Sequence, residues 1–161
     1  MRNKERGITV ISARFISLFL TALSAGVVLS HVMSRAGKLT LSGPLFITVQ
    51  NTLYRGWGKK VGAIELGAFL ASLAVTFLAR GRNPAFALCL ACSLCLLGML
   101  LVWAVFTNPL NVRVRASVPA TVPPDWTSLR DRWHRFHAVR AILAIAGLSA
   151  LISAVLLDCA R

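Results

Sequence analysis

The stretch AFALCLACSLCLLGMLLVWAVF, residues 85–106, decides the fold because it contains no charged side chain. A helix needs about 20 mostly apolar residues to span a bilayer, and backbone groups in lipid must be satisfied within the segment. Residues 85–106 therefore predict a transmembrane helix. Working outward from it, stretches of sufficient or nearly sufficient length predict three more spans, at residues 15–33, 61–79 and 141–157.

The composition agrees with this interpretation. Of 161 residues, 57% are hydrophobic and 14% are charged, whereas soluble domains average roughly 45–50% apolar residues. These values exclude a disordered tail, a disulfide-rich secreted miniprotein and an ordinary soluble enzyme. We expect an all-α fold, a four-helix up-down transmembrane bundle that forms a single domain over residues 1–161. We further expect a multi-pass integral protein of the plasma (inner) membrane.

The connections between the spans are unequal. Residues 80–84, Arg-Gly-Arg-Asn-Pro, predict a tight turn, whereas residues 34–60 and 107–137 are long connections that an up-down bundle places on one face. In the first, Pro44 and the following helical spacing predict an amphipathic interfacial helix at residues 44–55. In the second, the prolines at 123 and 124 precede a helical extension at residues 125–140. This extension continues into the fourth span and protrudes beyond the membrane.

The charge is unevenly distributed along the chain. Eighteen Lys and Arg residues against five Asp and Glu residues give +13. No soluble surface is present to read nucleic acid, so we expect anionic lipid headgroups as the partner and no nucleic acid. Seven basic residues fall on the face of the termini and the short turn: Arg2, Lys4, Arg6, Arg14, Arg80, Arg82 and Arg161.

The other eleven basic residues fall on the face of the long connections. They are Arg35, Lys38, Arg55, Lys59, Lys60, Arg113, Arg115, Arg130, Arg132, Arg135 and Arg140. The positive-inside rule places that face in the cytoplasm. The rule is unreliable, however, if several of these basic residues are present because they form a binding or catalytic site.

The cysteines in the third span allow two interpretations. Cys89 and Cys92 have the C-x-x-C spacing of thiol oxidoreductases, with Cys95 one turn later and Cys159 near the end of the chain. Small polarizable side chains that pack between helices explain the same pattern. We favour packing, because no basic residue lies near these thiols within the span.

Polar groups from all four spans converge at one level of the bundle. Glu65 lies near the start of the second span, His31 ends the first, Asn108 follows the third and His137 precedes the fourth. Placing an ionisable side chain within a membrane span costs free energy, so such a residue indicates a functional site in which it interacts with a specific partner. Serine and threonine stripes on the same helices favour an inward orientation: Ser17, Thr21 and Ser24 on the first span, Ser72 and Thr76 on the second.

Three interpretations of this convergence stay open. In the first, Glu65 pairs with an arginine or a histidine, and the pair only fixes the register of the helices. In the second, the polar groups form a substrate site. Alternatively, His31, Glu65 and His137 offer two nitrogens and a carboxylate to a metal. Because the sequence lacks H-x-x-H and E-x-x-H spacing, we predict no metal site.

The tryptophans of the long connections also have two interpretations. Trp57, Trp126 and Trp133 at headgroup depth are typical of an aromatic belt. Trp126 and Trp133 nevertheless share a helical stripe with Arg130 and His137, so they are equally suited to wall a pocket for a flat aromatic or quinone-like ligand. We favour the belt.

Several runs of residues resemble bacterial proteins of the anthrone oxygenase-like group, which are small four-span membrane proteins. The runs extend over nearly the whole chain: His31 with Gly37-Lys38-Leu39, Leu41-Ser42-Gly43, Val49-Gln50, Leu53-Tyr54-Arg55-Gly56, Ile64-Glu65-Leu66-Gly67-Ala68, Asn108-Pro109-Leu110-Asn111, and Trp126 with Leu129-Arg130, Trp133, His137 and Arg140. For fungal members, the resemblance implies oxidation of a polyketide anthrone to an anthraquinone by dioxygen. It assigns no cofactor.

The resemblance also implies a set of site residues. The candidate catalytic residues are Glu65, His137 and His31, and the candidate substrate-binding residues are Tyr54, Arg55, Gln50, Asn108, Trp126, Arg130 and Trp133. In the oxygenase interpretation, Glu65 or His137 removes a proton from a phenolic substrate, and Arg130 or Arg55 stabilises the phenolate. The alternative is a non-enzymatic membrane subunit or accessory protein, in which the same residues only fix helix packing against other membrane subunits.

Overall fold

The computed structural model describes residues 2–159, and it describes the side chains of residue 5 and of residues 7–158. The side chains of Arg2, Lys4, Arg6 and Cys159, and the whole of Arg161, lie outside this described part. Within it, the chain is all-helical, and four helices are long and apolar enough to cross a membrane. The expected all-α four-helix fold is confirmed, and the protein is an integral membrane protein.

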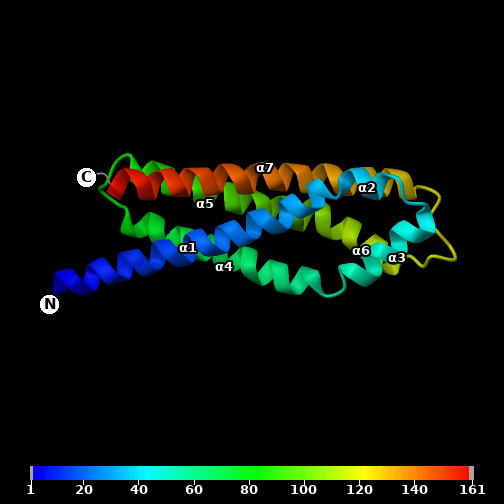
Figure 1. Cartoon of the computed structure of the whole chain (residues 1–161), viewed down its shortest axis with the longest axis horizontal. Coiled ribbons are helices and arrows are strands. Elements are labelled where there is room, and N and C mark those ends of the chain that lie inside the picture. Colours follow the sequence, from blue (N-terminus) through cyan, green and yellow to red (C-terminus); the bar gives the residue numbers. More distant parts are fainter. Residues whose placement is uncertain (1, 160–161) are drawn as a thin grey trace.

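The four long helices are α1 (Arg2–Met33), α4 (Trp57–Leu78), α5 (Ala85–Val102) and α7 (Trp126–Cys159). Helix α1 packs against α4 and α7, and α5 packs against the same two helices, which closes an antiparallel bundle. The α4–α5 turn lies at the end of the bundle where α1 begins and α7 ends (Figure 1). Both long connections lie at the opposite end, which we call the cap end.

The first long connection folds into α2 (Arg35–Leu39) and α3 (Gly43–Leu53). Pro44 occupies the first turn of α3, where a missing backbone N–H costs nothing. A left-handed turn at Gly56, with φ of +77°, then starts α4. Only glycine adopts this conformation without strain, so the sharp reversal between α3 and α4 depends on that residue.

The second long connection corrects an expectation. The sequence predicts that the third span ends at residue 106 and that a connection begins at residue 107, but the helix continues through a π-helical turn, η1 (Trp103–Thr107), into α6 (Asn108–Ala116). The predicted boundary follows the end of the apolar run, and the charged residues Arg113 and Arg115 of α6 lie beyond it. Non-helical chain covers only residues 117–125, before α7 runs unbroken from Trp126.

Two clusters of buried apolar side chains fill the molecule. The larger one runs along the bundle axis and contains Cys89, Cys92, Leu96 and Leu151. Gly147 of α7 lies against Cys95 and the backbone of Cys92, so these cysteines occupy a close helix–helix contact. The smaller cluster closes the cap end between α3, α6 and α7: Phe46, Ile47, Leu110, Val114, Leu129 and Trp133. We call it the cap cluster.

The polar stripes face inward, as their spacing indicated. Ser17, Thr21, Ser24 and Ser72 have no solvent-accessible surface. The hydroxyl of Ser72 lies 3.0 Å from that of Ser93 on α5, and the Thr76 hydroxyl lies 3.1 Å from the same group. At the end opposite the cap, Asp158 of α7 forms ion pairs with Arg14 and Arg82, which fastens α7 to α1 and to the α4–α5 turn.

Candidate functional site

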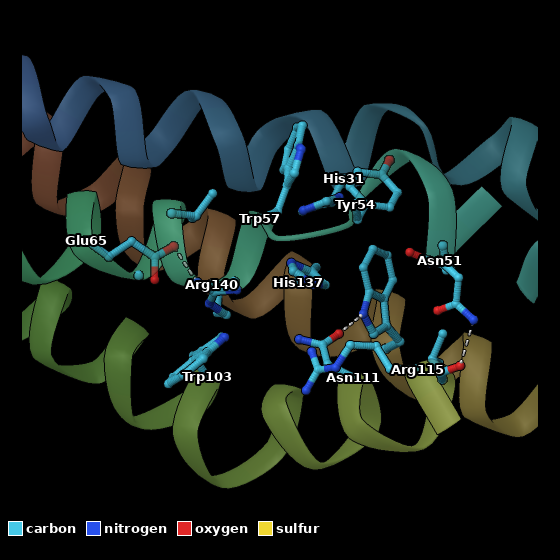
Figure 2. A pocket seen from close by; sticks show the side chains of 16 residues that line it. His31, Asn51, Tyr54, Trp57, Glu65, Trp103, Asn111, Arg115, His137 and Arg140 are labelled. Carbon is cyan, nitrogen blue, oxygen red and sulfur yellow. Dashed lines mark hydrogen bonds and ion pairs between the residues drawn. The ribbon is translucent and has the colours of Figure 1, made fainter. Parts of the chain in front are cut away.

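A small cavity lies between the axial core and the cap cluster. Figure 2 shows its lining, which comes from the end of α1, from α3, from the first turns of α4, from η1 and α6, and from α7. Its volume is about 80 Å³. All four spans therefore contribute to one site, at the level where the sequence places its polar groups.

The innermost polar group is an ion pair between α4 and α7. The Arg140 Nη2 atom donates a hydrogen bond to Glu65 Oε1 at 2.5 Å, and both side chains are at most 3% exposed. Of the partners that the sequence allowed for Glu65, an arginine or a histidine, the structure selects Arg140. The Glu65 carboxylate is therefore already engaged by a cation.

Aromatic rings surround His31 on the cap side of this ion pair. The His31 ring centroid lies 4.3 Å from that of His137, 5.0 Å from those of Tyr54 and Trp133, and 6.0 Å from that of Trp57. The Trp133 and His137 centroids are 4.0 Å apart. Five rings, from α1, the α3–α4 turn, α4 and α7, thus form one contiguous wall of the cavity, which suits a flat, apolar ligand.

Several nitrogens that border the cavity have no hydrogen-bond partner among the described residues. They are His31 Nδ1, Gln50 Nε2, both ring nitrogens of His137, and Arg140 Nε. Buried polar groups are normally hydrogen-bonded, so each such group in a native structure calls for an explanation. A neutral imidazole has one donor and one acceptor nitrogen, whereas Gln50 Nε2 and Arg140 Nε can only donate, and neither atom has a partner in the described part of the chain. The site therefore favours a ligand that carries acceptor oxygens.

The π-helical turn sets the position of Trp103 and α6. The Asn108 N–H bonds to the Trp103 carbonyl five residues back. Pro109 supplies no N–H for the Val105 carbonyl and sterically opposes a regular α-helix at that point. Beyond the turn, Asn111 Oδ1 accepts a 2.8 Å hydrogen bond from Trp133 Nε1. The turn thus joins the third span to the aromatic wall, in agreement with the frequent use of π-helical turns at functional sites.

Behind the aromatic wall lies a buried lysine. The Lys38 Nζ atom is 4.5 Å from the Tyr54 ring centroid and 5.0 Å from the Trp133 ring centroid. Lys38 is 6% exposed, and cation–π attraction to the two rings partly offsets the loss of its hydration. This contact holds α2 against the wall from the side away from the cavity.

The structure brings six of the ten sequence-derived candidates to the cavity. They are His31, Gln50, Tyr54, Glu65, Trp133 and His137. Trp133 is 3% exposed, so the belt interpretation is wrong for this residue and the pocket-wall interpretation fits it. Trp57 also lines the cavity, at its exposed edge.

The other four candidates lie elsewhere. Trp126 packs against Phe46 in the cap, and Arg130 lies over the Trp126 ring and donates to the Leu39 carbonyl at 3.3 Å. These two residues fasten α7 to α2 and α3. Arg55 is exposed in the turn before α4. Asn108 lines a separate, adjoining hollow rather than the cavity.

Sequence reasoning left out lining residues that the structure supplies. Arg140 fell on the helical stripe of Trp133 and His137, but nothing in the spacing singled it out as the partner of Glu65. Asn111 belongs to one of the runs that carry the family resemblance, but the resemblance gives it no role. Trp103 lies inside the uncharged third span and gave no signal, because its orientation depends on the π-helical turn.

The metal interpretation finds no support in the part of the chain that the structure describes. Among the described side chains, those of residue 5 and residues 7–158, no group of three or more His, Cys, Asp or Glu is arranged to hold a metal ion. His31 and His137 lie side by side, but Glu65 is turned toward Arg140 (Figure 2). The residues present therefore do not assemble the two-nitrogen, one-carboxylate set.

Comparison with known proteins identifies the family. No curated protein and no solved structure matches the chain. A family model described as "Anthrone oxygenase" matches residues 50–150, a range that begins at Gln50 of the cavity and includes Glu65, Trp133, His137 and Arg140. The four-span bundle, the cavity at its cap end and this match agree with one another: the chain belongs to the anthrone oxygenase family.

Proposed function

We propose that this protein is a membrane oxidoreductase that uses dioxygen to oxidise a lipophilic, quinone-like aromatic compound. The observation that carries the proposal is the five-ring wall around His31, with unpartnered nitrogens facing the same cavity. An aromatic substrate with oxygen substituents matches both features. Family membership supplies the reaction type, because its description names an anthrone oxygenase.

His137 is the side chain best suited to act as the base. Neither of its ring nitrogens has a hydrogen-bond partner within residues 2–159, and it stands between His31 and Trp133 in the cavity wall. Glu65, the other candidate base, is held by Arg140. A general base must reach the proton that it removes, and His137 lines the cavity with both ring nitrogens uncommitted to a partner among the described residues.

The residues that stabilise a substrate phenolate also differ from those that the family resemblance implies. Arg55 and Arg130, suggested by the family resemblance, do not line the cavity, whereas Arg140 and Arg115 do. The Nε atom of Arg140 has no partner in the described chain and is available to an oxyanion on the substrate. Preorganised donors that meet developing negative charge in a dry site give the largest electrostatic stabilisation.

The proposed reaction balances without a cofactor. His137 removes one proton from the methylene group of an anthrone-type ring, and the resulting carbanion is stabilised as an enolate beside Arg140. The carbanion gives electrons to dioxygen and forms a carbon–oxygen bond, and the protonated imidazole returns its proton to the distal oxygen. Loss of the second methylene proton and of that oxygen as water leaves a carbonyl group.

The test is oxygen uptake by the purified protein with anthrone as substrate. His137→Phe keeps a ring in the wall and removes both nitrogens, so kcat is expected to fall by roughly 10²-fold or more. The melting temperature should barely change, because no hydrogen bond is lost. His134→Phe is the matched control, since His134 is also buried on α7 but does not line the cavity. Equal turnover in the two variants would contradict the base assignment.

A second candidate function is a non-enzymatic subunit of a membrane assembly. The Glu65–Arg140 pair supports it, because a buried ion pair between two spans fixes helix register without any chemistry. In that case, wild-type protein consumes no oxygen with anthrone, and His137→Phe changes co-purification with other membrane subunits instead. The oxygen-uptake assay therefore separates the two candidates.

A further inference from the structure

A second, larger hollow adjoins the cavity. Its volume is about 490 Å³, and it lies between the turn that starts α4 and the η1–α6 segment. Tyr54, Gly58, Trp103 and Arg115 line both spaces. The two are therefore neighbouring compartments of one depression, which we call the inner cavity and the outer hollow.

The volumes of the two compartments indicate how much of a ligand each can hold. The inner cavity, at about 80 Å³, is smaller than the roughly 150 Å³ cavity that accepts a single benzene ring. The outer hollow falls in the range of about 300–1,000 Å³ that is usual for small-molecule sites. A ligand of several fused rings thus fits only with most of its body in the outer hollow and one edge in the inner cavity.

Along the bundle axis, packed side chains close the inner cavity at both ends. Toward the cap end, Phe46, Ile47 and Leu129 of the cap cluster are at most 1% exposed. Toward the opposite end, the axial core closes the bundle with Val28 and Ala68, which have no exposed surface. In contrast, the first turn of α4, residues 57–60, is exposed beside the outer hollow.

Two glycines keep the side of the depression open. Gly58 lines both compartments, and Gly62, one turn later on α4, lines the inner cavity just before Glu65. A Cβ atom added at either position meets no heavy atom within 4 Å. The space that a Cβ atom would take at either glycine is therefore unoccupied by protein.

We propose that the ligand enters sideways, from the lipid phase, between the start of α4 and η1–α6, and that Gly58 and Gly62 keep this passage open. The occupant is a flat, apolar molecule of two or three fused rings with an acceptor oxygen. Trp103 and Tyr54 line its path, and Lys59 and Arg115 attract the oxygen at the rim. This inference rests on the proposed function, because it assumes that an aromatic ligand binds the inner cavity.

The test uses protein in lipid nanodiscs and 1-hydroxyanthraquinone as the probe, with quenching of tryptophan fluorescence as the readout. Gly58→Leu and Gly62→Leu should weaken binding about tenfold or more, because the leucine side chain occupies space that the rings require. Gly26→Leu is the matched control: a Cβ there also meets no heavy atom within 4 Å, and Gly26 lines neither compartment. It should bind the probe like wild type.

The outcomes separate the passage from the proposed function. If wild-type protein binds the probe and both leucine variants keep its dissociation constant and association rate, the proposed passage is contradicted. The proposed function is not affected by that result. Wild-type protein that fails to bind the probe contradicts the proposed function, and the passage with it. Gly62→Ala adds a graded check, since a single methyl group should weaken binding less than leucine does.

Discussion

At the scale of single residues, the Glu65–Arg140 pair is the most consequential contact in the molecule. It joins α4 to α7 where both side chains are almost fully buried. Desolvating two charges costs free energy that their attraction recovers only with good geometry, and removing one partner leaves an uncompensated charge in the interior. The pair therefore stabilises the fold chiefly because neither member can be lost alone.

We predict that Glu65→Gln destabilises the folded protein, by an amount that approaches the about 3–5 kcal/mol typical of a broken buried ion pair. Arg140→Met should have a similar effect. The double variant should recover much of the loss, because no charge then remains unpaired. Thermal unfolding of the four proteins in one detergent measures the coupling, and additive single effects would contradict it.

The same variants separate stability from catalysis. If Glu65 acts only through Arg140, the double variant regains stability but not turnover, because the cation beside the substrate oxygen is absent. Oxygen uptake with anthrone in the refolded double variant is the measurement. Restored turnover would show that neither residue takes part in the reaction.

At the scale of elements, the π-helical turn η1 distinguishes the third span from a plain transmembrane helix. It depends on Pro109, which withholds an N–H from the Val105 carbonyl, and it positions Asn111 to accept the Trp133 indole hydrogen bond. A local irregularity in one helix thereby determines which side chains of the next segment reach the site.

We predict that Pro109→Ala allows regular helix through residues 103–109 and shifts Asn111 away from Trp133. The indole N–H resonance of Trp133 should move upfield, as its hydrogen bond weakens, and probe binding should fall while the melting temperature holds. Pro44→Ala is the control, because Pro44 also lies in the first turn of a helix but outside the cavity. An unchanged indole resonance in Pro109→Ala would contradict the role of the turn.

At the scale of the whole molecule, the two ends of the bundle differ in structure and in charge. The cap end carries α2, α3 and α6, the cavity and most of the basic residues, whereas the other end carries the short turn and the Asp158 ion pairs. We propose that the cap end faces the cytoplasm of a cell whose plasma membrane holds the protein, with its basic side chains near anionic headgroups.

This orientation predicts the outcome of reporter fusions in a bacterial host. Alkaline phosphatase fused after α7 should be active, and a fluorescent protein at the same place should be dark, because α7 ends outside the cytoplasm in this orientation. Fusions after residue 120, in the loop before α7, should give the reverse pattern. The opposite result at both positions would place the cap end outside and would show that the cap arginines serve the site rather than the topology.

Much of the fold follows from local properties of the sequence. Residues 85–106 specify a membrane helix because lipid leaves backbone groups no other way to be satisfied. The spacing of Ser17, Ser24 and His31 identifies the inward face of α1, since side chains seven residues apart lie on one side of a helix. The level of the site follows in the same way, from the positions of Glu65 and His137 along their spans.

Only the tertiary structure decides which of these groups meet. Helical periodicity gives the face of a residue but not the rotation of its helix against the neighbours, so Arg140 rather than a histidine becomes the partner of Glu65. The same freedom leaves Arg130 and Trp126 in the cap and brings Trp103 into the cavity lining. The sequence by itself thus determined four spans and the level of a candidate site, whereas packing between the helices determined which side chains line it, because contacts between distant segments depend on the whole bundle.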